Sequence, residues 1–190
     1  MSKNNKTAPL VPDGPIYPEL KGRRALVLGG SRGIGRAISE RLATEGMHLA
    51  INYSRSADIA EEAAAACRER GVDVQLIQGD IGVESELKTV MESCISEGPL
   101  DVLVNNAARG LERPRSASEQ RTQHLHKTMD VNLFGPWFAS QMAIPHMQAR
   151  GSGAIINLLS PGAWKYMAGY SAVATSKAAL ESLTRYLGVE

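Results

Sequence analysis

The sequence has few cysteines, almost no excess charge and no long hydrophobic run. Cys67 and Cys94 are too few for a disulfide framework or a zinc site, and they fit a reducing cytoplasm. A net charge of +1 over 190 residues favours neither nucleic acid nor a membrane surface as partner. No apolar run approaches the ~18 residues of a membrane span, and the first residues lack the apolar core of a signal peptide. The four histidines form no ligand constellation, so we expect no metal.

After a polar start, apolar runs alternate with helical patterns, which is typical of a parallel α/β sheet. Residues 1–22 are polar and carry prolines, and we predict a loose N-terminal arm. Residues 23–190 are predicted to form one dinucleotide-binding domain. The expected strands are 25–28, 48–53, 72–78, 100–104 and 154–159, and the expected helices are 36–43, 57–70, 84–97, 121–149 and about 170 to 190.

This order predicts a Rossmann fold, a doubly wound parallel sheet with strand order 3-2-1-4-5. A full fold of this kind has at least one more strand, so we expect C-terminal strands to be missing from this chain. The helix expected over 121–149 should be interrupted or kinked near Gly135-Pro136 and Pro145. The last helix should still be running at Glu190.

The run Gly29-Gly-Ser-Arg-Gly-Ile-Gly35 joins the first expected strand to the first helix. Strand, glycine turn and helix form the context of a dinucleotide site. Gly29 permits a tight turn, while Gly33 and Gly35 leave room for a pyrophosphate and for the helix to pack on the strand. The helix start then presents N–H groups to the phosphates, although an ordinary strand-to-helix turn is the alternative. We assign cofactor contacts to Gly29, Ser31, Arg32, Gly33, Ile34 and Gly35.

The second expected strand lacks the acidic residue that usually holds the ribose 2′-hydroxyl of NAD. The segment Asn52-Tyr-Ser-Arg-Ser56 is followed by no acid until Asp58. Arg55 and Arg32 can pair with a 2′-phosphate, which a carboxylate would repel. The sequence therefore predicts NADPH rather than NADH, and the alternative for Arg55 is a solvated loop charge.

Two polar residues stand where a ligand or a buried partner is expected. Asp80 follows the third strand, at the edge where ligands of open parallel sheets bind. Its carboxylate could accept from an adenine amino group or cap the next helix, and the spacing favours neither. Asn132 lies among apolar neighbours inside the long helix, so its side chain should have a partner.

Four segments in this order resemble the short-chain dehydrogenase/reductase family: Gly29–Gly35, Asp80, Asn105-Asn-Ala107 and Asn132. The resemblance covers residues 23–190 and implies NAD(P)(H)-dependent reduction or oxidation on a Rossmann fold. It further implies adenosine contacts by Asp80, Ile81, Asn106 and Ala107.

The expected catalytic end departs from the usual pattern of that family. Most members have Tyr-x-x-x-Lys, but four residues before Lys177 stands Val173, which has no proton to donate. Ser160 lies thirteen residues before Val173, where the helper serine of the family normally lies relative to its tyrosine. Tyr170 stands three residues earlier. The spacing Tyr170-x6-Lys177 and the sequence around it resemble the NADPH-dependent enoyl-[acyl-carrier-protein] reductase III branch.

The wider spacing favours a division of roles between the two side chains. In one continuous helix Tyr170 and Lys177 would lie about 10.5 Å apart along the axis, so the lysine would act weakly on the phenol. We expect Lys177 to hold the nicotinamide ribose and Tyr170 to donate to a thioester oxygen as it becomes an enolate. Ser160 is a further candidate catalytic residue and Tyr166 a further candidate phenol. Core packing of Tyr170 and a solvated position for Lys177 are the alternatives.

The sequence thus predicts NADPH-dependent reduction of the 2,3 double bond of an enoyl thioester, carried by acyl carrier protein or coenzyme A. One alternative is a carbonyl reductase that uses Tyr170 or Tyr166. Another is a nucleotide-binding remnant without catalysis. The resemblance also implies a homo-oligomer, a tetramer or dimer, built partly on residues 121–149 and 170–190.

Overall fold

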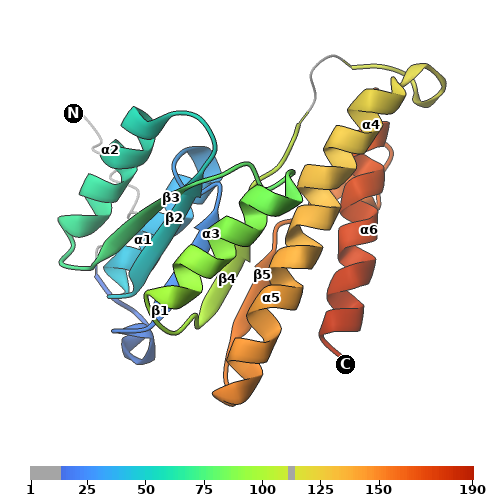
Figure 1. Ribbon diagram of the computed structural model, residues 1–190. Coiled ribbons are helices and arrows are strands. Elements are labelled where there is room, and N and C mark those ends of the chain that lie inside the picture. Colours follow the sequence, from blue (N-terminus) through green and yellow to red (C-terminus); the bar gives the residue numbers. More distant parts are fainter. Residues whose placement is uncertain (1–13, 111–113) are drawn as a thin grey trace, which may run out of the picture.

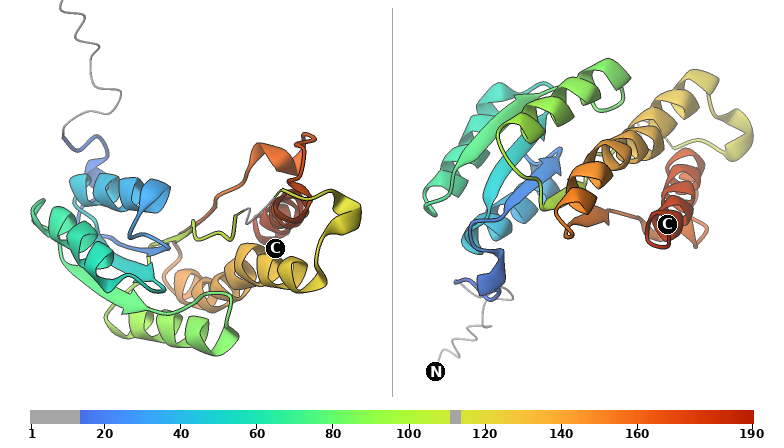
Figure 2. Two further views of the ribbon diagram at one scale, coloured as in Figure 1. Left: turned by 90° about the horizontal axis from the view of Figure 1, so that it is seen from above. Right: turned by 60° about the horizontal axis from the view of Figure 1, so that its bottom comes forward.

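The computed structural model describes residues 14–110 and 114–190. A parallel sheet lies between two layers of helices (Figure 1, Figure 2). The order β3-β2-β1-β4-β5 confirms the predicted Rossmann fold and strand order. The strands are β1 (Arg24–Leu28), β2 (His48–Tyr53), β3 (Val74–Gln78), β4 (Val102–Asn105) and β5 (Ala154–Asn157).

The helices lie close to the predicted ranges, with two differences. The helix expected over 121–149 is divided by a π-helical turn, η3 (Asp130–Phe134), which ends just before Gly135, while Pro145 lies inside α5 without ending it. The last helix stops at Leu187 with Gly188 as its C-cap, so the prediction that it runs to Glu190 is wrong. The helices are α1 (Gly33–Thr44), α2 (Ala57–Arg68), α3 (Glu84–Ser96), α4 (Thr122–Met129), α5 (Gly135–Ala149) and α6 (Ser171–Leu187), and the 3-10 turns are η1 (Pro18–Leu20), η2 (Ala117–Glu119) and η4 (Pro161–Ala163).

Helices cover both faces of the sheet over its central strands, which explains why those strands are apolar throughout, whereas Ala154 and Ile156 of the edge strand β5 are exposed. Leu26 and Leu28 of β1 pack in a core cluster with residues of α3 and α5. Ala25, which points to the other face, packs with residues of α1 and α2. The two clusters lie on opposite faces of the central strands. The parallel strands they hold end along one edge of the sheet.

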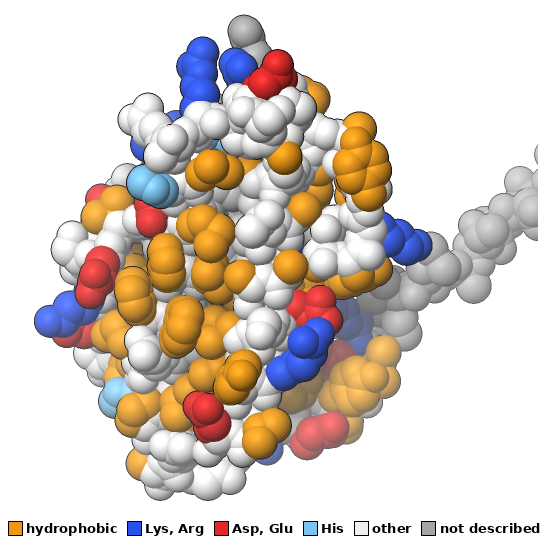
Figure 3. Space-filling view, turned by 90° about the vertical axis from the view of Figure 1, so that its right-hand side faces the viewer, with side chains coloured by type: hydrophobic (Ala, Val, Ile, Leu, Met, Phe, Trp, Pro, Cys, Tyr) orange, Lys and Arg blue, Asp and Glu red, His pale blue; other side chains and the backbone are white. Residues whose placement is uncertain are grey.

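A third cluster holds α6 beside α4 and the π turn rather than over the centre of the sheet (Figure 1). Leu180 and Leu183 of α6 pack there against Leu133. Figure 3 shows hydrophobic side chains gathered on the side of the molecule that carries these C-terminal helices. The exposed large hydrophobic residues of α5, α6 and the adjoining η3 and β5 are Phe134, Trp137, Ile156 and Tyr186.

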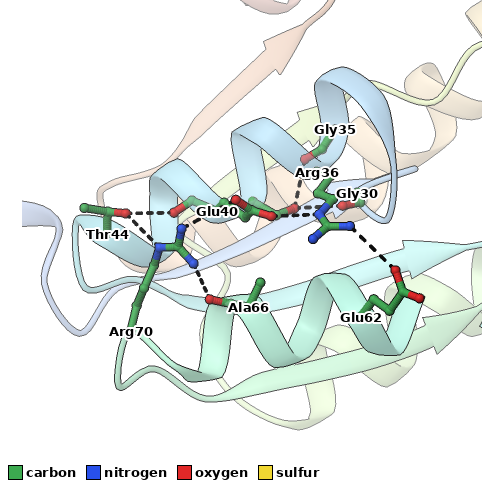
Figure 4. A network of polar contacts seen from close by, with 9 residues as sticks. Gly30, Gly35, Arg36, Glu40, Thr44, Glu62, Ala66 and Arg70 are labelled. Atoms are coloured by element: carbon green, nitrogen blue, oxygen red, sulfur yellow. Dashed lines mark hydrogen bonds and ion pairs between the residues drawn. The ribbon is translucent and has the colours of Figure 1, made fainter. Parts of the chain in front are cut away.

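Polar contacts join α1 to α2 (Figure 4). Arg36 pairs with Glu40 at 2.7 Å and with Glu62 at 4.0 Å. Arg70, which follows α2, reaches back to Glu40 at 3.5 Å and donates to the Thr44 hydroxyl at 3.1 Å. This network ties α1 to α2 and to the residues that follow α2.

The arm predicted over 1–22 is described only in part, since residues 1–13 lie outside the described residues. The remainder contacts the domain. The N–H groups of Ile16 and Tyr17 each donate to one carboxylate oxygen of Glu45 at 2.8 Å. Glu45 follows α1 and is only 3% exposed, so this part of the arm is bound to a buried charge.

The ionisation of Glu45 depends on those contacts. Burial would raise the pKa of its carboxyl group. The N–H groups of Tyr17 and Ile16 and the guanidinium of Arg41 outweigh burial, and together they hold the pKa below its ordinary value. Glu45 therefore stays charged while the arm is bound.

Candidate active site

The glycine turn after β1 has the geometry of a phosphate-binding turn. Gly29 has a φ of 69°, and a Cβ placed there would lie 2.9 Å from the Cα of Ala107. A Cβ on Gly35 would overlap the carbonyl oxygen of Gly29 and the side-chain nitrogen of Asn106. These two glycines are therefore required for packing α1 against the ends of β1 and β4.

Gly33 differs from its neighbours because it faces open space. Its φ is 54°, and no atom lies within 4 Å of the position that a Cβ would take. It is the first residue of α1, where N–H groups lack partners within the helix. This open approach fits the pyrophosphate of a dinucleotide. Around it, Ser31 is buried, Arg32 is the exposed N-cap residue, and Ile34 is 68% exposed.

Two asparagine side chains hold the turn in place. Asn52 is 2% exposed; its Oδ1 accepts from the N–H of Gly29 at 3.2 Å, and its Nδ2 donates to the carbonyls of Ile77 and Gly79 at 3.2 and 3.0 Å. Asn106 donates to the Gly29 carbonyl at 2.9 Å. Sequence reasoning missed the role of Asn52, although a polar residue at the end of an apolar strand was a signal.

The residues predicted to bind the adenosine half lie after four neighbouring strands, with Asn106 and Ala107 following β4. Arg32 follows β1 and Arg55 follows β2, and both are exposed. Asp80 and Ile81 follow β3. The structure thus places these residues along one edge of the sheet, beside the glycine turn.

The two interpretations of Asp80 can now be compared. Val83 is the N-cap residue of α3, and Asp80 instead accepts from the N–H of Gly82 at 2.9 Å within the loop. The helix-cap alternative is therefore wrong. The Ile81 side chain is 5% exposed and packs in the core, so its side chain supports the loop. Ala107 is anchored by its N–H, which donates to the Leu28 carbonyl at 2.7 Å.

The candidate catalytic residues Ser160 and Tyr170 come together. Ser160 follows β5 and precedes η4, and Tyr170 is the N-cap residue of α6. Their hydroxyl oxygens lie 3.1 Å apart, and both residues are partly exposed. Two adjacent hydroxyl groups at the edge of a site can donate to one oxygen of a ligand. Tyr166, the other candidate phenol, is 93% exposed.

Lys177 and Val173 occupy the buried face of α6. Lys177 is 4% exposed and donates from Nζ to the Leu158 carbonyl at 2.7 Å, which does not fit a solvated helix face. Burial lowers the pKa of its ammonium group to about 8. Val173 is 3% exposed and brings no proton to the site.

Asn132 has the partners that its sequence environment predicts. Its Oδ1 accepts from the N–H of Arg109 at 2.7 Å, and its Nδ2 donates to the Arg109 carbonyl at 3.1 Å and to the Ser176 hydroxyl at 3.0 Å. Ser176 is fully buried next to Lys177. Asn132 therefore joins the loop after β4, the π turn and α6. Sequence reasoning did not single out Ser176.

The cysteines and the possible metal ligands among the described residues form no second reactive site. Cys67 and Cys94 are buried free thiols, and burial raises the pKa of each to about 11. Within 14–110 and 114–190, no group of three His, Cys, Asp or Glu residues could hold a metal ion. No helix in that part of the chain has both the length and the apolarity to cross a membrane.

Comparison with known proteins identifies the family. The model of the family described as short chain dehydrogenase matches residues 23–190. The chain belongs to the short-chain dehydrogenase/reductase family. Members of this family bind nicotinamide dinucleotides, and the glycine turn, Asn106 and Lys177 described above lie within the match.

Individual relatives agree with this assignment. A 3-oxoacyl-[acyl-carrier-protein] reductase FabG of Staphylococcus aureus is 38% identical over 177 residues, which are 88% of this chain and 71% of that protein. An uncharacterized oxidoreductase of Thermotoga maritima is 35% identical over 90% of this chain and 66% of that protein. A variant of a Serratia marcescens short-chain dehydrogenase/reductase has a TM-score of 0.80 at 38% identity, over 89% of this chain and 70% of that one.

Proposed function

We propose that this chain is an NADPH-dependent reductase of acyl thioesters, in which Tyr170 and Ser160 hold a carbonyl oxygen. The observation that carries the proposal is the 3.1 Å contact between their hydroxyl groups, which follow β5 and precede α6. Donors that are already in place stabilise the negative charge that develops on such an oxygen. Lys177 is then the residue that holds the nicotinamide ribose, and Asn132 positions the loop facing it.

The finer proposal is reduction of a 2-enoyl thioester. When bound, reduced nicotinamide supplies a hydride, which goes to C3 in both 2-enoyl and 3-oxoacyl thioesters. In the 3-oxoacyl case the charge develops on the oxygen attached to C3, whereas in the enoyl case it develops on the thioester oxygen, two carbons away. Tyr170 lies ahead of α6, and Val173 inside the helix has no hydroxyl. A hydroxyl donor at residue 170 instead of residue 173 suits the thioester oxygen, which is the more distant of the two from C3.

A second candidate is reduction of the 3-oxo group itself. It is favoured by the similarity to a FabG protein named as a 3-oxoacyl-[acyl-carrier-protein] reductase, which fits this candidate better than the enoyl one. It is also compatible with the Ser160–Tyr170 pair, since Tyr170 could give its proton to the ketone oxygen.

NADPH oxidation with crotonyl-CoA and acetoacetyl-CoA, measured side by side, tests the proposal. Turnover of crotonyl-CoA alone supports enoyl reduction, and turnover of acetoacetyl-CoA alone assigns the 3-oxo reaction. Binding of NADPH without turnover of either thioester contradicts both and favours a nucleotide-binding protein without catalysis.

We assign the preference for NADPH to Arg32 and Arg55. Each is exposed beside the glycine turn, and an arginine–phosphate hydrogen bond contributes about 1.5–3 kcal/mol. Arg55→Ala should therefore weaken NADPH binding roughly tenfold or more and leave NADH binding nearly unchanged. Lys88→Ala, which removes an exposed positive charge from α3, is the matched control. Equal losses for the two cofactors would contradict the assignment.

The partners follow from the same proposal. An acyl carrier protein or coenzyme A would carry the substrate. The exposed side chains of Phe134 and Trp137, at the junction of η3 and α5, are proposed to contact another copy of the chain. Sedimentation analysis of Trp137→Glu should show a smaller species than the unmodified chain, and an unchanged species would contradict this.

A further inference from the structure

Gly162, in η4, packs closely against the ring of Tyr170. A Cβ built on Gly162 would lie 2.6 Å from Cδ1 and 2.7 Å from Cε1 of the Tyr170 ring. Real Cβ atoms are essentially never found this close to another heavy atom. The phenol ring therefore lies directly on the backbone of Gly162, in space that any other residue would fill.

Gly162 is not needed for its backbone conformation. It is absent from the glycines with positive φ, so an alanine there meets no backbone strain. Its N–H lies 3.5 Å from the Ser160 hydroxyl, which caps η4. The one feature that requires glycine is the ring of Tyr170.

We infer that Gly162 is a positioning residue for Tyr170, because its missing side chain lets the phenol reach Ser160 from a position ahead of α6. This inference rests on the proposed function only for its catalytic consequence. The steric part stands on the packing alone. A methyl group at residue 162 would displace the ring and separate the hydroxyl groups that now lie 3.1 Å apart.

A double-mutant cycle on thermal stability tests the steric part without any assay of activity. Gly162→Ala should lower Tm in the unmodified chain, and it should cost little in a Tyr170→Ala background, where the ring is gone. An equal loss of Tm in both backgrounds would show that the methyl group collides with something else, which would overturn the inference. Gly188→Ala is the matched control, since its Cβ would come no closer than 3.4 Å to the Thr184 carbonyl.

Turnover tests the catalytic part. Gly162→Ala should lower kcat on the order of 100-fold, as loss of an oxyanion donor does, while its Kd for NADPH stays within about twofold. Combined with Tyr170→Phe, it should lower kcat no further than Tyr170→Phe alone. Wild-type kcat in Gly162→Ala, or losses that multiply in the double variant, would overturn the inference. If the unmodified chain reduces neither thioester, the proposed function fails, and the stability cycle still decides the role of Gly162.

Discussion

Two glycines of the same turn should respond differently to replacement by alanine. Gly35→Ala should mainly lower stability, whereas Gly33→Ala should mainly weaken NADPH binding. At Gly35 the added methyl group overlaps the Gly29 carbonyl and the Asn106 side chain, which are partly buried at the ends of β1 and β4. Overpacking costs about 1–3 kcal/mol, and loss of the hydrogen bond from Asn106 to Gly29 adds about 1–3 kcal/mol. The expected destabilisation is about 4 kcal/mol, which in a chain of this length lowers Tm by about 8–16 °C.

At Gly33 the methyl group enters open space, so only the left-handed backbone opposes it. That strain costs about 1–2 kcal/mol, and Tm should fall by only about 2–8 °C. The same methyl group stands where the pyrophosphate is expected, so the Kd for NADPH should rise at least about tenfold. Circular dichroism and nucleotide fluorescence measure the two effects. Equal loss of stability in Gly33→Ala and Gly35→Ala, or unchanged NADPH binding by Gly33→Ala, would refute the reasoning.

Three further predictions concern buried polar groups. The pKa of Lys177 is lowered to about 8. The affinity for NADPH should therefore fall as pH rises past 8, because the ammonium group loses its proton. Lys177→Met should show no such dependence on pH. Because the unfolded chain keeps that proton to higher pH, the free energy of unfolding should rise above pH 8 relative to Lys177→Met. The pKa of Glu45 is lowered, so Glu45→Gln should be less stable at pH 7, and thermal scans should show the difference shrinking as pH falls below its ordinary value of 4.5. Asn132→Ala removes two hydrogen bonds to the backbone of Arg109 and should cost about 2 kcal/mol in chemical unfolding, and a cost near zero would contradict the packing described.

The fold was predictable because its signals are local. Apolar runs of strand length, helical spacing of apolar residues and the glycine turn at 29–35 each specify structure within about twenty residues. The strand order followed from the alternation of strands and helices together with the doubly wound order that such dinucleotide-binding sheets have. The misplaced end of the last helix at Glu190 is a local signal that was missed, since the helix ends at Gly188 and glycine commonly ends helices.

The candidate site was predictable only where residue identity carries the chemistry. Lys177, Tyr170 and Ser160 became candidates because their types and spacing resemble the short-chain dehydrogenase/reductase family, but the 3.1 Å contact between the hydroxyl groups depends on how η4 meets α6. The packing of Tyr170 on Gly162 and the contacts of Asn52 with the ends of β1 and β3 depend in the same way on tertiary structure. Residues that act through packing or backbone contacts leave little trace in a single sequence.

The single-turnover rate of NADPH oxidation by Tyr170→Phe, at saturating crotonyl-CoA, tests the central claim most directly. The account predicts a rate lower by about 100-fold or more, with NADPH binding unchanged, because the ring remains and only the hydroxyl group next to Ser160 is lost. Val173→Ala, which removes no proton donor, should keep a rate within a few-fold of the unmodified chain. A Tyr170→Phe variant as fast as the unmodified chain would contradict the claim that this phenol holds the substrate oxygen.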